Sequence, residues 1–549
     1  MISRLPLIGA SLVFLCVLGW GALLFQGLPA SDLDDWDKIL LARETPWSEF
    51  TGSFLTPWSQ SHNWIGQTDR YDEVHYKRIV LPMLLKLSQQ WFGVNYFAMY
   101  LLTKAFFFAG CMAIVFILLT QAVPLSYALL GTITFLFVPI HYSHVFWIAD
   151  SATIGYFFFF LGILLLSMLI RSPFDKQARG RFWALLAGLF VTGWVGIKTK
   201  EMMLVLSLIV FVYSLLNFKQ WKTAPARWAL LNLAMFVMAF QIIPITHLNS
   251  GSTQGFHFNF NTLFRLLFLN YDCGYENEVR SAFVSWDHVF PVSIARTLGI
   301  FMLWTTVFAF VFYLWRRWFK RDAGLIRFLA NPVIVVCAIW CLIELPFLGM
   351  LQPDPRYFSG IMAPILILLV RLFYCVLKGA SQNARIVFGI LLAVSFGFNI
   401  FENAQNCISL RLMVGKKMNR FSETARRILE DVRGTKISDD LTVGKAYCSI
   451  CGDTAGGETI RDLTYYVDLG FEAWNKVPLA KDNFQDFLEK AKLGYRYYAT
   501  FNKLEPVEFP EIKLIGLVDG INHSSLLEQA VYAKKKKRPT VLKIFKYTS

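Results

Sequence analysis

Charged residues are scarce in this 549-residue sequence: Asp, Glu, Lys and Arg together fill only 17% of its positions. A soluble globular protein normally carries about a quarter. Hydrophobic residues make up 55% of the chain, and its mean hydropathy is +0.46. Apolar runs of about 17 to 25 residues, each long enough to cross a bilayer, recur through the first three quarters of the chain. The shortage of charge therefore argues against a soluble protein and predicts a helical protein that crosses the membrane many times.

Ionisable residues are also rare inside the apolar runs, where Glu344 is the notable exception. A transporter or flippase would need such residues in the middle of its spans. The sequence shows no repeat of about 20 to 50 residues and no inverted repeat of the transporter type. These absences disfavour a transporter or flippase, which remains an alternative function.

Metal-binding patterns are incomplete. Cys448 and Cys451 form a Cys-x-x-Cys pair, but no second pair and no histidine cluster follow it. A local disulfide or two unpaired thiols therefore fit better than a metal site. His141 and His144 have a suitable spacing for zinc, but only Asp150 lies close to them in the sequence. We expect no metal ion and no other cofactor, with a divalent cation held by carboxylates as the alternative.

Eleven apolar segments are predicted to span the membrane. The segment from 79 to 91 is not among them, because it is short and is interrupted by Pro82 and Lys86. It fits a helix that lies at the membrane surface. The predicted spans are residues 6–27, 97–120, 125–142, 150–170, 182–198, 202–217, 227–246, 296–315, 330–350, 357–377 and 384–402.

The formal net charge of +15 comes from an excess of basic residues, many of which lie in the loops between these segments. Basic residues cluster on one side of the predicted membrane, which the positive-inside rule assigns to the cytoplasm, so we expect no nucleic-acid partner. The basic stretches are Arg4, 171–181, 218–227, 316–321 and 378–385. The opposite, outer side receives 28–96, 141–150, 199–201, 247–295 (with an interfacial helix at 261–270), 351–356 and the tail from 403.

The tail is more polar than the rest of the chain. Residues 422–433 fit a helix, and LTVGKAYC, YRYYATFN, IKLIGLVDG and TVLKIFKYT fit short strands. The expected fold class is thus an α-helical polytopic membrane protein, with a membrane module at 1–402 and a small α/β domain at 403–549 on the non-cytoplasmic side. The basic run at 534–538 fits a solvated turn or a contact with anionic headgroups.

Acidic, basic and aromatic side chains gather at the outer mouths of the predicted helices. Carboxylates in such places act as a general base, hold a divalent cation, or cap helix N-termini. Lysine and arginine suit phosphate, which the arginine fork matches in geometry. Together these residue types indicate chemistry on a lipid-linked anionic substrate. The residues are Asp34 and Asp35 in the first outer loop, Asp150, Lys200, Glu201, Arg356 and Tyr357.

Four segments resemble the polytopic glycosyltransferases of the GT-C type, which include the enzymes that transfer mannose from dolichyl or polyprenyl phosphate to proteins. The order and spacing of the segments also agree, over roughly residues 1–400. The segments are YKRIVLPMLLKLSQQWFGVNYFAMYLLTKAFF (76–107), FLFVPIHYSHVFWIADSATIGYFFFFLGILLL (135–166), GIKTKEMMLVLSLIVFVYSLL (196–216) and PDPRYFSGIMAPILILL (353–369).

The resemblance implies an integral membrane enzyme that transfers a sugar from a polyprenyl-phosphate donor to a glycan, lipid or protein acceptor at the outer or lumenal face. Asp34 or Asp35 would deprotonate the acceptor, and Asp150 would be the second acidic position. The residues implied near the donor phosphate are Lys200, Glu201, Arg356, Tyr357 and Arg78. A polymerase or ligase of lipid-linked polysaccharide is the nearest alternative among enzymes. The membrane is the inner or plasma membrane, or that of the endoplasmic reticulum.

The sequence departs from the family pattern in two of these segments. It reads Tyr76-Lys77-Arg78-Ile79 where the family has a proline after the arginine. Ala149 and Asp150 stand where the family has an Arg-x-Asp motif. These departures suggest a branch distinct from the well-known members.

Overall fold

The structure is a computed structural model whose described residues form two compact units, one of helices and one of strands. It describes 4–28, parts of 38–61, 77–93, 95–138, parts of 141–148, 150–171, 179–200, 203–216, 225–240, 311, 331–350, 359–379, scattered positions of 381–400, 445–448, 495–500, 512–519 and 541–547.

Among the described residues, a helix lies in nine of the eleven predicted spans. In the part of the chain that the structure describes, four helical stretches are long and apolar enough to cross a membrane: Leu5–Phe25, Tyr96–Ala122, Ala152–Arg171 and Gly180–Ile197. The segment 296–315 lies outside the described residues apart from Val311, and 384–402 is described only in part, so the count of eleven stays a prediction. The helices are α1 (Arg4–Phe25), α5 (Tyr96–Tyr100), the π-helical η2 (Leu101–Ala105), α6 (Phe106–Ala122), α7 (Leu125–Leu136), α9 (Ala152–Arg171), α10 (Arg179–Ile197), α11 (Met203–Leu216), α12 (Pro225–Phe240), α17 (Pro332–Met350) and α19 (Met362–Gly379).

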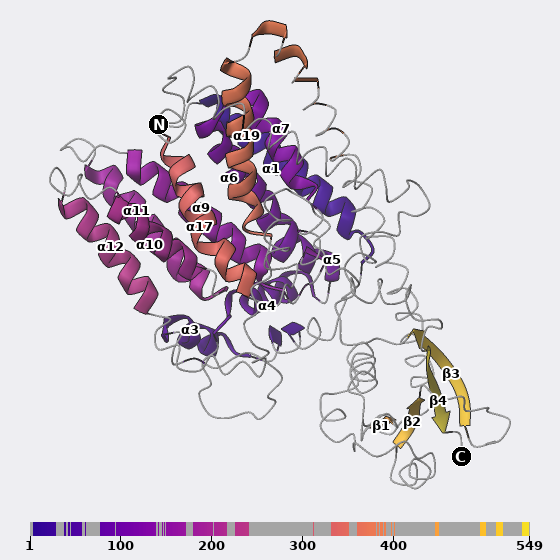
Figure 1. Cartoon of the computed structure of the whole chain (residues 1–549). Coiled ribbons are helices and arrows are strands. Elements are labelled where there is room, and N and C mark those ends of the chain that lie inside the picture. The colour runs from indigo at the N-terminus through magenta and orange to yellow at the C-terminus, as the bar shows by residue number, and fades with distance from the viewer. Residues whose placement is uncertain are drawn as a thin grey trace. The chain divides into compact units, whose positions relative to one another are not determined.

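Helix α6 forms the centre of the helical unit and packs against α1, α7 and α9 (Figure 1). It is apolar on all sides and most of its side chains are buried, as expected of a helix surrounded by others. A Cβ atom added at Gly110 would lie 2.5 Å from the ring of Phe157 on α9, so glycine permits this close approach. The core therefore brings α6 into direct contact with α9, although α7 and the 137–151 link separate the two helices in the sequence.

Arginine side chains at one end of the helical unit donate hydrogen bonds to backbone carbonyls or to a side-chain amide oxygen. Arg371 on α19 donates to the carbonyl oxygen of Ala122 at 2.6 Å, and Arg227 on α12 donates to that of Leu169. Arg171 at the end of α9 donates to Oδ1 of Asn331 at 3.3 Å. Cations suit the C-terminal ends of helices, where carbonyls lack partners. This is the end that the basic loops predict to be cytoplasmic, and the orientation itself stays a prediction.

Two short helices lie at the other end of the unit. They are α3 (Trp47–Leu55) and α4 (Val80–Phe92), and the predicted helix at 79–91 is thus confirmed. Phe50 of α3 and Ile79, the residue before α4, are fully buried together. At 13 residues α4 is too short to cross a bilayer, and its place at the membrane surface stays a prediction.

A four-stranded mixed sheet forms the second unit. Its strands are β1 (Lys445–Cys448), β2 (Tyr495–Thr500), β3 (Ile512–Asp519) and β4 (Val541–Tyr547), in the order β1-β2-β4-β3. Strand β1 runs parallel to β2, and β4 is antiparallel to both of its neighbours (Figure 1). All four predicted strands are confirmed.

Several predictions about the outer side fall outside the described residues. The predicted helices at 261–270 and 422–433 lie there, and so does Cys451. The boundary between 402 and 403 stays a prediction.

Candidate functional site

Asp150 caps the N-terminus of α9. Its Oδ1 atom accepts a hydrogen bond of 2.7 Å from the backbone N–H of Ala152, the first residue of the helix. A carboxylate just before a helix is favoured, because it satisfies an otherwise free N–H at the positive end of the helix. The capping role considered for this carboxylate is therefore real, and it leaves Oδ1 fixed in place for a second contact.

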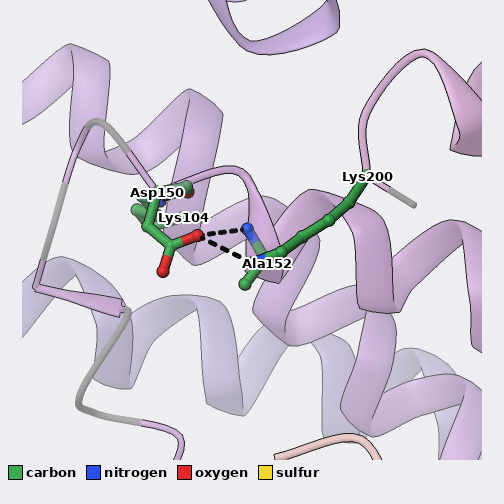
Figure 2. Close-up of polar contacts among 4 residues, drawn as sticks. All are labelled: Lys104, Asp150, Ala152 and Lys200. Atoms are coloured by element: carbon green, nitrogen blue, oxygen red, sulfur yellow. Dashed lines mark hydrogen bonds and ion pairs between the residues drawn. The ribbon is translucent and has the colours of Figure 1, made fainter. Parts of the chain in front are cut away.

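Lys200 makes that second contact. Its Nζ atom lies 3.3 Å from Oδ1 of Asp150, and the two side chains are only 11% and 6% exposed (Figure 2). The backbone N–H of Lys200 donates to the carbonyl of Gly196 at 2.9 Å, which sets the lysine on the turn that ends α10. The structure thus joins two predicted site residues that are fifty positions apart in the sequence.

Lys104 is a third member of the site, and the sequence analysis missed it. It lies on the π-helical turn η2, is fully buried, and its Nζ donates to the backbone carbonyl of Asp150 (Figure 2). The view that Glu344 is the notable ionisable residue within the spans is therefore wrong, since Lys104 lies inside the span predicted at 97–120. The available signal was the lysine itself, because a cation inside an apolar run is a functional hypothesis by default. A π-turn at the same place is typical of functional sites.

The three side chains form a charged cluster in a largely apolar unit, which we call the Lys–Asp–Lys cluster (Lys104, Asp150 and Lys200). Burial matters here because charges shielded from water interact more strongly and are little screened by salt. One ammonium group at the Asp150 carboxylate and a second at its backbone carbonyl suit the stabilisation of an anion, such as a phosphate that gains charge as it leaves. The cluster is held by helix ends and a turn, so its geometry exists before any substrate arrives.

Of the other predicted site residues, only Arg78 is among the residues that the structure describes. Arg78 is exposed and stands two residues before Val80, whose N–H donates to the carbonyl of Lys198 at 3.4 Å. That contact brings the backbone near Arg78 to the segment that carries Lys200. The remaining residues, Asp34, Asp35, Glu201, Arg356 and Tyr357, lie outside the described residues, and their roles stay predictions.

His141 links the segment that leads to Asp150 with the start of α19. Its Nδ1 atom shares a hydrogen bond with Oγ of Ser359, and its ring packs edge-on against Phe135 at 4.4 Å between centroids. These contacts give His141 a structural role. Ser359 stands two residues after Tyr357, so the hydrogen bond also ties down the chain next to the predicted phosphate-binding residues.

No family model matches the sequence, and no curated protein matches it. Solved structures do match. ArnT from Cupriavidus metallidurans matches in the apo state with a TM-score of 0.53 and 12% identity, and bound to undecaprenyl phosphate with 0.52 and 12%. Both matches cover 98% of this chain and 98% of ArnT. An oligosaccharyltransferase from Archaeoglobus fulgidus matches with a TM-score of 0.47 and 11% identity, over 89% of this chain and 69% of that one. This chain shares the fold of ArnT.

Proposed function

We propose that this chain transfers a sugar from a polyprenyl-phosphate donor to an acceptor at the outer or lumenal face of the membrane. The observation that carries the proposal is the Lys–Asp–Lys cluster, at the end of the helical unit opposite the arginine-rich end. An ArnT structure with the same fold is described as bound to undecaprenyl phosphate, a lipid phosphate of the class proposed here as leaving group. Fold and cluster thus point to the same class of donor.

The reaction is a single displacement at the anomeric carbon of the donor sugar. The acceptor hydroxyl or amine forms the new bond to that carbon, and its proton passes to a carboxylate of the first outer loop, Asp34 or Asp35. The bond between the carbon and the phosphate oxygen breaks, and the polyprenyl phosphate leaves with the electron pair. Attack from the face opposite the phosphate inverts the configuration, as the resemblance implies.

The cationic side chains act on the leaving phosphate. Its negative charge grows as the bond breaks, and preorganised cations stabilise this charge more in the transition state than in the bound donor. We assign this role to Lys200 and Lys104 of the cluster, with Arg356, Tyr357, Glu201 and Arg78 as further predicted contacts of the donor. Asp150 holds the ammonium groups in place. We expect transfer to proceed without a divalent cation.

The test is a transfer assay in membranes that contain the overproduced chain. Radiolabelled sugars on polyprenyl phosphate are supplied, and label in the acceptor fraction is compared with label taken up into sealed vesicles. We expect protein-dependent transfer that persists in excess EDTA, with no protein-dependent uptake. Uptake without transfer would overturn the proposal in favour of a transporter or flippase. Growth of a lipid-linked polymer would favour the polymerase or ligase alternative.

A further inference from the structure

Lys198 binds the C-terminal end of α3 from a distant part of the chain. Its Nζ atom donates to the carbonyl oxygen of Ser53 at 2.9 Å and to that of Thr56. The indole N–H of Trp194, one turn earlier on α10, donates to the carbonyl of Phe54 at 3.3 Å. The last carbonyls of a helix lack partners within it and carry partial negative charge, so a cation fits them well.

The burial of Lys198 makes this contact unusual. The residue is 1% exposed, and taking an ammonium group out of water is costly unless it is well bound. Burial lowers the pKa of Lys198 to about 8, in keeping with that cost. Lysine side chains otherwise extend readily to water and keep many rotamers, whereas this one is held in a single place. The bonds to α3 therefore fix the position of Lys198 itself.

Lys198 and Lys200 belong to one short turn. The N–H groups of Thr199 and Lys200 both donate to the carbonyl of Gly196, at 3.0 and 2.9 Å. The carbonyl of Lys198 accepts the N–H of Val80 at the start of α4. The two lysines thus leave the same turn, one toward α3 and the other toward Asp150. An anchored Lys198 therefore fixes the backbone from which the side chain of Lys200 extends.

We propose that Lys198 is a positioning residue for Lys200: anchored on the end of α3, it holds the 198–200 turn so that Lys200 reaches Asp150. The proposal rests on the proposed function only where it concerns catalysis. Lys198 does not touch the Lys–Asp–Lys cluster in any described contact, so it acts through the turn. A shift of about 1 Å in a charged group at a reacting centre lowers rates by about 100-fold, which makes such an anchor consequential.

A chemical test of Lys200 is independent of catalysis. In the folded protein its side chain is 11% exposed and bound to Asp150, so a water-soluble amine-reactive reagent should label it slowly. Lys198→Met removes the ammonium anchor with little change in length, and we expect labelling of Lys200 to become about tenfold faster, as for a lost charged hydrogen bond. Lys198→Arg keeps the charge and the donors and should label like the wild type. Lys378→Met, which changes an exposed lysine at the other end of the unit, is the matched control.

The kinetic test is a double-mutant cycle in the transfer assay. If Lys198 acts through Lys200, Lys198→Met should lower kcat by about tenfold in the wild type and by less than about threefold in the Lys200→Met background. Equal losses in both backgrounds would show a general loss of stability and overturn the proposal. Unchanged labelling of Lys200 in Lys198→Met would overturn it as well, whether or not transfer is ever found. Faster labelling in a chain that never transfers sugar would keep the positioning role and reject the proposed function.

A milder variant covers the case in which Lys198→Met does not fold. Trp194→Phe keeps an aromatic ring on α10 but loses the hydrogen bond to Phe54. We expect the same direction of change in labelling, by about two- to threefold, because the lost hydrogen bond has an uncharged donor. No change in this folded variant, together with wild-type labelling of Lys200 in a folded Lys198→Gln variant, would overturn the proposal.

Discussion

Replacing Asp150 by asparagine is expected to lower the rate of sugar transfer by about 100-fold or more, the loss typical of removing one preorganised electrostatic contact at a reacting centre. Asparagine has the same shape and caps helices as well as aspartate does. Its side-chain oxygen can still accept the N–H of Ala152, so the start of α9 should remain intact. What disappears is the negative charge that Lys200 reaches at 3.3 Å. The variant therefore separates the electrostatic role of Asp150 from its capping role.

The free energy of unfolding provides the control for this experiment. Asp150→Asn leaves the buried ammonium group of Lys200 without its carboxylate, and removing one partner of a buried ion pair typically costs about 3–5 kcal/mol. Adding Lys200→Met removes the unbalanced cation and should recover part of this stability. The double variant should nevertheless keep the low transfer rate of Asp150→Asn, because the cation proposed to stabilise the leaving phosphate is gone. Transfer at the wild-type rate by a folded Asp150→Asn variant would contradict the role of the cluster.

The membrane helices could be predicted because the bilayer allows few other solutions. A chain in lipid must satisfy its backbone internally, so a long apolar run becomes a helix whatever it packs against. Asp150 and Lys200 were predictable as neighbours for a related reason. Both stand at helix mouths on the same predicted side, and one membrane surface brings such residues close together. The structure places their side chains in contact, while the membrane side and the roles of the two residues stay predictions.

Lys104 shows where the same reasoning fails. It lies eight residues into the continuous helix Tyr96–Ala122, about 12 Å from its start at 1.5 Å per residue. Its partner is a backbone carbonyl, which every residue possesses and no side-chain pattern marks. Which carbonyl it meets depends on how α6 and α9 pack, and Gly110 sets that approach through tertiary contact. Local sequence therefore revealed a lysine in an apolar run but not its place in the site.

For the sheet too, local sequence predicted the elements but not their long-range contacts. Alternating apolar residues predicted all four strands, because the side-chain pattern of a strand is local. The parallel pairing of β1 with β2, and the place of β4 between β2 and β3, join strands that lie far apart in the sequence. Pairing order is a long-range property that short strands do not encode by themselves.

Replacing Asp34 and Asp35 one at a time by asparagine is the second prediction with a large effect. Asparagine is isosteric with aspartate but cannot take a proton at neutral pH. A general base contributes about 10²- to 10⁴-fold to rate, so one of the two variants should lose kcat by that factor. The other should stay within about threefold of the wild type, as should Asp32→Asn, the matched control from the same acidic stretch. We expect Asp34 to be the sensitive position.

The pattern of kinetic constants distinguishes this base from the residues that hold the donor. A base acts on the acceptor proton in the transition state, so its loss should lower kcat and leave the KM for the polyprenyl-phosphate sugar unchanged. Asp150→Asn should instead raise that KM as well, because the ammonium group that Asp150 holds is the one proposed to contact the phosphate of the bound donor. If both Asp34→Asn and Asp35→Asn fold normally and keep wild-type rates, the first outer loop does not supply the base. Asp150 would then become the next carboxylate to test for proton transfer.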